Sequence, residues 1–93
     1  MPELHKNADQ GRYEITEGGQ VVGFAEYQDQ GDTVVMPHTE VSAGHEGEGL
    51  GSQLAQFALN DIRQAGKKVV PTCPFIRSYI EKHAEYADLV AQG

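Results

Sequence analysis

The sequence predicts a single α+β domain, in which a mixed sheet of three to four antiparallel strands is followed by a helix, a parallel strand and a final helix. The length of 93 residues fits one domain. Up to residue 41 the side chains alternate as in strands, whereas from residue 49 apolar residues recur every three or four positions, as in helices. The strand–helix–strand order of the second half implies a parallel pair joined by a right-handed crossover.

The first strands are expected to form a hairpin. Residues 12–16 and 21–27 have the composition of strands, and Gly18-Gly19 between them is a strong signal for a tight turn. Strict alternation puts Val22 and Phe24 on the same face of the second strand.

A third extended run is expected over residues 33–41, after a turn at residues 29–32. Its β-branched side chains favour a strand. Pro37 lacks a backbone donor, so we expect a bulge, a bend or an edge position there. Residues 3–6 are expected to add a short leading strand.

Two helices and one more strand complete the chain. Apolar residues follow helical spacing over residues 49–65, and Gly66 is the expected stop signal beyond them. Residues 69–71 predict a short buried strand. Pro74 suits the first turn of a final helix that begins just after Cys73.

Composition disfavours several classes of protein. The net charge is −7, from 14 acidic and 7 basic residues, which disfavours binding to nucleic-acid phosphates. A single Cys rules out an internal disulfide and fits a reducing compartment. No apolar run approaches the ~20 residues of a membrane span, and the His and Cys residues lack the spacing of metal ligands. We therefore expect a cytoplasmic monomer or weak dimer that binds no nucleic acid, membrane or metal.

Residues 41–54 lead from a strand through a glycine-rich loop into a helix. Glycines let backbone N–H groups approach an anion closely, and the helix N-terminus adds partial positive charge. This combination predicts a phosphate site without basic side chains. A P-loop fits poorly, because Leu50 stands where that motif needs Lys. A dinucleotide loop also fits poorly, because Ser52 stands at its third glycine.

The hexapeptide Glu46-Gly47-Glu48-Gly49-Leu50-Gly51 resembles the motif Gln/Arg-x-x-Gly-x-Gly/Ala of the GNAT superfamily of acetyl-coenzyme A-dependent N-acetyltransferases. Glu46 departs from the motif's Gln or Arg. His38-Thr39-Glu40-Val41 before the loop and Cys73-Pro74-Phe75 after the next strand resemble the very small members of that superfamily. The likeness covers residues 11–90 and implies a single minimal GNAT domain over residues 1–93.

The resemblance also implies where acetyl-coenzyme A binds. Its diphosphate is expected on the backbone amides at the start of the helix, and its pantetheine arm along the preceding strand. Its thioester is expected in a cleft where two strands splay apart, close to Cys73. The implied binding residues are Val41, Ser42, Glu46, Gly47, Glu48, Gly49, Leu50, Gly51, Ser52, Cys73, Pro74, Phe75, Tyr79 and His83.

Some side chains are candidates for chemistry, each with a structural alternative. Cys73, at a helix N-terminus that stabilises a thiolate, is either an acetyl-accepting nucleophile or a small buried side chain. His38 is either a general base, for the amine or for Cys73, or a sheet histidine. Glu40 has the same strand parity as His38, and either assists in proton transfer or is a solvated charge. By the resemblance, Tyr79 protonates the leaving thiolate; otherwise it packs in the core. His45, beside the loop, either touches a phosphate or is solvated.

These observations lead to a functional expectation with two rivals. The expected activity is transfer of an acetyl group from acetyl-coenzyme A to an amine, such as a polyamine, a small amine or a protein lysine. The first rival is a module that binds coenzyme A or acyl-coenzyme A with little or no turnover. The second is an interaction domain without a bound cofactor. The acidic chain is compatible with a basic protein or a polyamine as acceptor.

Overall fold

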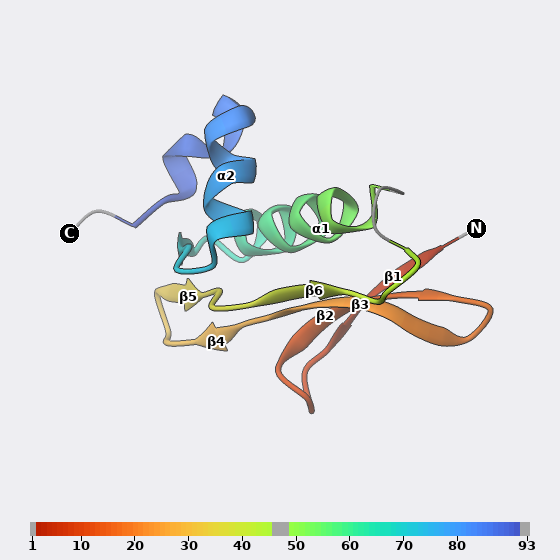
Figure 1. The fold of residues 1–93 in the computed structure, drawn as a ribbon. Coiled ribbons are helices and arrows are strands. Elements are labelled where there is room, and N and C mark those ends of the chain that lie inside the picture. Colours follow the sequence, from red (N-terminus) through yellow and green to blue (C-terminus); the bar gives the residue numbers. More distant parts are fainter. Residues whose placement is uncertain (1, 46–48, 92–93) are drawn as a thin grey trace.

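The first sheet of the protein is antiparallel and lies beneath the first helix (Figure 1). The computed structural model describes residues 2–45 and 49–91. The strand order in this sheet is β1-β2-β3-β6, so the expected hairpin and the short leading strand are both present. The strands are β1 (Glu3–Asn7), β2 (Arg12–Glu17), β3 (Gln20–Glu26) and β6 (Thr39–Val41).

A second, smaller sheet continues beyond the first. It contains β4 (Gln28–Asp29), β5 (Thr33–Val35) and β7 (Lys68–Val70), in the order β4-β5-β7. The pairing of β5 with β7 supplies the expected parallel pair. The extended run expected over residues 33–41 is therefore two strands in different sheets. Pro37 lies at the break between them, which agrees with the bend expected there.

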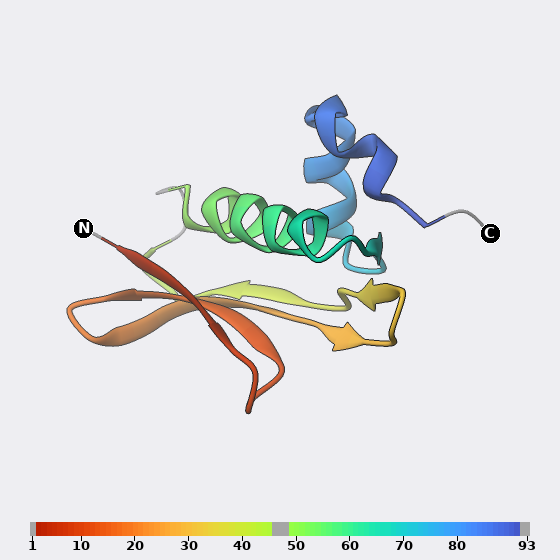
Figure 2. The same cartoon turned by 180° about the vertical axis from the view of Figure 1, so that it is seen from behind.

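The helices gather on one side of the first sheet, as Figures 1 and 2 show from opposite directions. Helix α1 (Leu50–Gln64) packs on β2, β3 and β6, and helix α2 (Pro74–Lys82) rises near the end of the second sheet. A 3-10 helix, η1 (Ala84–Leu89), packs against α2 and α1. Ile15, Leu54 and Ile62 are completely buried in the core between α1 and the sheet. In the described ranges no helix is long and apolar enough to cross a membrane.

A β-bulge in β3 corrects the expected assignment of faces. Ile15 pairs with Gly23 and Thr16 with Val21, so Val22 is the extra residue on the bulged strand. Val22 is buried in the core. Phe24 instead points to the other face, where its ring contacts the guanidinium of Arg12. Strict alternation was wrong here, because the bulge shifts the register by one residue.

The side of the first sheet opposite α1, here called the outer face, holds a buried acid. Glu14 is 3% exposed, although alternation along β2 turns it away from the apolar core. Its carboxylate accepts hydrogen bonds from Arg12 and Asn7 and lies 2.8 Å from Nε2 of His5. Burial alone would raise the pKa of Glu14, but the hydrogen bonds from Arg12, His5 and Asn7 outweigh it and lower the pKa below its usual value. Glu14 is therefore a fully paired charge that ties β1 to β2.

Glu14→Gln is expected to make the free energy of unfolding fall less steeply as the pH is lowered. A carboxyl whose pKa is lower in the folded protein stabilises it above the unfolded-state pKa of about 4.3, and that stabilisation is lost as the pH falls through the folded pKa. The variant should be less stable than wild type by about 1–3 kcal/mol at pH 7, since Arg12 loses its charged partner. Urea unfolding between pH 7 and pH 3 measures both effects. Glu3→Gln, at an exposed site on β1, is the control and should keep the wild-type dependence of stability on pH. If Glu14→Gln lost as much stability at acid pH as wild type does, Glu14 would not be the group responsible.

Candidate functional site

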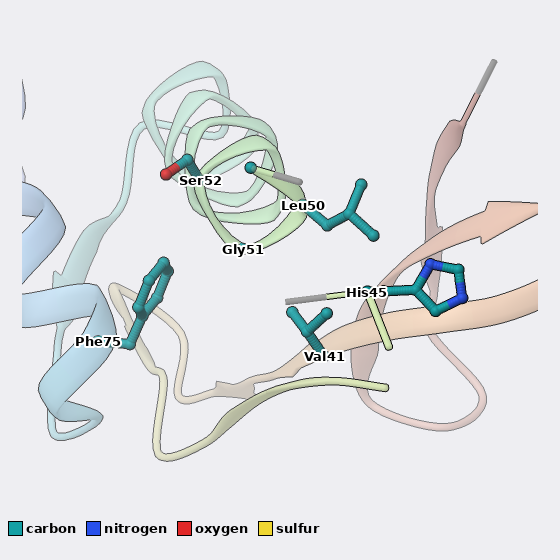
Figure 3. Close-up of a pocket in the computed structure, with 7 residues that line it drawn as sticks. Val41, His45, Leu50, Gly51, Ser52 and Phe75 are labelled. Carbon is teal, nitrogen blue, oxygen red and sulfur yellow. The ribbon is translucent and has the colours of Figure 1, made fainter. Parts of the chain in front are cut away.

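A cavity of about 350 Å³ opens where the first turn of α1 faces β6 and the start of α2 (Figure 3). Figure 3 shows Val41 below the helix terminus and the ring of Phe75 standing beside it. Among the described residues that line this cavity there is no carboxylate, although the chain as a whole is acidic. This cavity, here called the first cavity, is lined by Val41, His45, Gly49, Leu50, Gly51, Ser52 and Phe75.

The start of α1 gives this cavity its chemistry. Gly49 is the N-cap and has φ 76° and ψ 13°, a left-handed conformation that favours glycine. Its carbonyl already accepts a hydrogen bond from the N–H of Gln53, so the helix begins at once. Among the described residues no side chain caps this terminus, and no acidic residue lies in the first turn of α1. The first amides of a helix have no acceptor within it, and amides in this position can bind an anion.

Gly51 and Phe75 fit each other closely. A Cβ atom on Gly51 would lie 2.8 Å from the Cζ atom of Phe75, closer than real contacts allow. The ring of Phe75 is nevertheless 41% exposed, because its other side faces the cavity and solvent. The absence of a side chain at residue 51 thus lets α2 approach α1 and makes Phe75 a wall of the site.

The structure brings together part of the expected binding set. Six expected residues line the first cavity, while Glu46, Gly47 and Glu48 lie outside the described residues. The N–H of Ser42 donates to the carbonyl of Val22 on β3. The expected residues that line the cavity are Val41, Gly49, Leu50, Gly51, Ser52 and Phe75, and the described ones that do not are Ser42, Cys73, Pro74, Tyr79 and His83.

His45 also lines the cavity, and its only signal in the sequence is its position beside the glycine loop. Its Nδ1 lies 3.5 Å from a carboxylate oxygen of Glu17. The imidazole points away from Phe75 in Figure 3.

Cys73 is buried at the junction of β7 and α2. It is the N-cap of α2, its N–H donates to the carbonyl of Met36, and the residue is 3% exposed. Its Sγ lies 3.5 Å from Oγ1 of Thr39 on β6. The thiol therefore joins the start of α2 to β6.

His38 and Glu40 lie on the other side of β6 from Cys73. Nε2 of His38 is 3.1 Å from Oε1 of Glu40, and both side chains are more than half exposed, at 51% and 61%. The ring of His38 lies near that of Phe24 on the outer face. Successive residues of a strand point to opposite faces, so Thr39 reaches Cys73 while its two neighbours project outward. The structure thus brings His38 and Glu40 together as a pair, but does not bring them to the thiol.

Tyr79 and His83 form a stacked pair on α2. Their ring centroids are 3.9 Å apart with an interplanar angle of 16°, and Nδ1 of His83 lies 2.8 Å from the carbonyl oxygen of Tyr79. Burial raises the pKa of the Tyr79 phenol, and the neighbouring Tyr86 and Glu85 raise it further. The phenol therefore keeps its proton at neutral pH.

No group of three or more His, Cys, Asp or Glu side chains suited to hold a metal ion occurs in residues 2–45 and 49–91.

Comparison with known proteins identifies the family and the fold of this chain. Residues 12–89 match the model of the GCN5-related N-acetyltransferase family. The fold is similar to a GCN5-like protein from Staphylococcus aureus, with a TM-score of 0.74 and 20% identity over 98% of this chain and 89% of that chain. No curated protein sequence matches.

Larger enzymes share the fold over part of their length. The ribosomal-protein-S18-alanine N-acetyltransferase of Escherichia coli has a TM-score of 0.67 and 17% identity, over 77% of this chain and 50% of that enzyme. A ribosomal-protein-alanine N-acetyltransferase of Brucella melitensis has a TM-score of 0.63 and 19% identity, over 88% of this chain and 62% of that enzyme. The chain therefore spans about half to two thirds of the length of these two enzymes.

Proposed function

Because the chain belongs to the GCN5-related N-acetyltransferase family, we propose that it moves an acetyl group from acetyl-coenzyme A to an amine, with the donor bound in the first cavity. The observation that carries this proposal is the start of α1 beside Gly49 and Gly51, which no described side chain caps. Backbone amides at an open cavity whose described lining carries no carboxylate suit a diphosphate. The expected residues Glu46, Gly47 and Glu48 continue this loop in the sequence.

The other proposed contacts with acetyl-coenzyme A follow from the positions of the strands. Val41 lines the cavity at the end of β6, so the pantetheine arm is proposed to run along Val41 and Ser42. From there it leads back toward Thr39, which lies against the thiol of Cys73. Phe75 covers the arm from the α2 side.

The acceptor amine is proposed to react from the outer face, where His38 and Glu40 lie. If the N–H at Nε2 of His38 donates a hydrogen bond to Glu40, Nδ1 is left to take a proton from the amine. The amine nitrogen then attacks the thioester carbon, so that a C–N bond forms and the C–S bond breaks. Tyr79, held protonated by its surroundings, is the proposed donor of a proton to the coenzyme A thiolate.

Two measurements test the proposal and separate it from its rivals. Acetyl-coenzyme A should raise the melting temperature, because a ligand that binds only the folded state stabilises it. Thiol release should then appear with at least one amine among polyamines, amino sugars and peptide lysines. A melting shift without turnover on any amine would favour a coenzyme A-binding module. No shift at millimolar ligand would defeat the proposal and favour an interaction domain.

Cys73→Ala is expected to keep most of the wild-type rate of acetyl transfer. The thiol is buried against Thr39, and direct attack by the amine needs no enzyme nucleophile. Intact mass of the wild-type protein after incubation with acetyl-coenzyme A should show no acetyl adduct on Cys73. The covalent alternative passes the acetyl group through an acetyl-Cys73 thioester. It would be supported by such an adduct together with an inactive Cys73→Ala.

A further inference from the structure

A second cavity, of about 470 Å³, lies on the other side of α2 from Phe75. It is formed by the end of β7, the turn that follows it, one face of α2 and the C-terminal segment. Its volume is within the range of sites for small molecules. The second cavity is lined by Val70, Pro71, Thr72, Arg77, Ile80, Glu81 and Val90.

The position of this cavity follows from the strand geometry. Val69 is completely buried and pairs with Val34 in the second sheet, so the next residue, Val70, projects from the opposite face of β7. The C-terminal segment runs beside β7, where Val90 bridges to Val69 and the N–H of Ala91 donates to its carbonyl. The second cavity is thus separated from the first by α2, and none of the described residues of the glycine loop lines it.

The walls of the second cavity are apolar, but its rim carries two opposite charges. Val70, Ile80 and Val90 supply apolar surface, whereas Arg77 and Glu81 are exposed at its edge. These two side chains are one helical turn apart, a spacing at which opposite charges on a helix usually attract. In the described residues they form no ion pair with each other or with another side chain, and the guanidinium of Arg77 reaches only the carbonyl of Thr72, at 3.4 Å.

We propose that the second cavity binds an apolar α-amino acid as its zwitterion. The carboxylate lies on Arg77, whose planar guanidinium suits a carboxylate. The ammonium lies on Glu81, one turn further along α2. The apolar side chain of the ligand fills the space between Val70 and Ile80. This assignment does not depend on the first cavity or on acetyl transfer.

Three probes that share one carbon skeleton test the proposal. L-Leucine carries both charges, isopentylamine lacks the carboxylate, and 4-methylpentanoate lacks the amine. We expect L-leucine to move the backbone amide resonances of Val70, Thr72, Ile80 and Glu81 in two-dimensional NMR. It should bind about 10-fold more tightly than either analogue, as expected for the loss of one charged hydrogen-bonding partner.

Two variants assign the charges. Arg77→Gln should remove the advantage of L-leucine over isopentylamine, and Glu81→Gln should remove its advantage over 4-methylpentanoate. Both positions are exposed, so both variants should fold. Lys82→Gln, at an exposed position on the same helix but outside the cavity lining, should bind all three probes as wild type does. Equal affinity for the three probes, or no movement of these resonances with L-leucine, would overturn the proposal, whatever the outcome with acetyl-coenzyme A.

Discussion

Gly49→Val is expected to abolish the stabilisation of this protein by acetyl-coenzyme A. At a ligand concentration of 100 times Kd, binding adds about 2.7 kcal/mol, which is roughly 10–20 °C in Tm for a domain of this size. Gly49 is the N-cap of α1 and lines the first cavity. A valine side chain there would occupy the space through which the diphosphate must approach the amides. Differential scanning fluorimetry with and without the ligand measures the loss.

Gly66→Val is the matched control for this variant. Gly66 lies just beyond the other end of α1, with φ 73° against 76° for Gly49, and a Cβ atom at either residue would meet nothing within 4 Å. Both variants should therefore lose similar stability without ligand, about 1–2 kcal/mol from the left-handed backbone. Only Gly66→Val should keep the full ligand shift. A full shift in Gly49→Val would show that the anion site lies elsewhere.

The order of the elements could be predicted from the sequence, because each has a strong local signal. Helical spacing and Gly66 set the extent of α1, and Pro74 after Cys73 set the start of α2. The bulge at Val22 and the division into two sheets could not be predicted, because they depend on pairing between distant strands. Local propensity carries no information on which strands pair.

At the site, too, the local motif could be predicted from the sequence, whereas the packing around it could not. The sequence motif directed attention to Gly49 and Gly51, and both line the first cavity. The close contact of Gly51 with Phe75 depends on how α1 and α2 cross, which no motif records. The burial of Glu14 could not be predicted either. It results from neighbouring side chains on β1 and β2 and not from a helix or strand packed over that face.

His38→Gln is expected to lower kcat/KM for amine acetylation by about 10²–10⁴-fold, the usual contribution of general acid–base catalysis. Binding of acetyl-coenzyme A should be unchanged, because His38 lies on the outer face and the donor is proposed to bind on the α1 side. Glu40→Gln should lower the rate in the same direction by a smaller factor, since it removes the partner that orients the imidazole.

The protein contains its own control for this prediction. His5 and Glu14 form a second His–Glu contact on the outer face, at 2.8 Å, but on β1 and β2 and not on β6. His5→Gln removes a comparable contact without touching the edge of β6, so its kcat/KM should stay near that of wild type. If catalysis depended only on the general electrostatics of this acidic face, the two histidine variants would behave alike. A wild-type kcat/KM in His38→Gln would exclude His38 as the base, because the proton of the amine would then have to go to another residue.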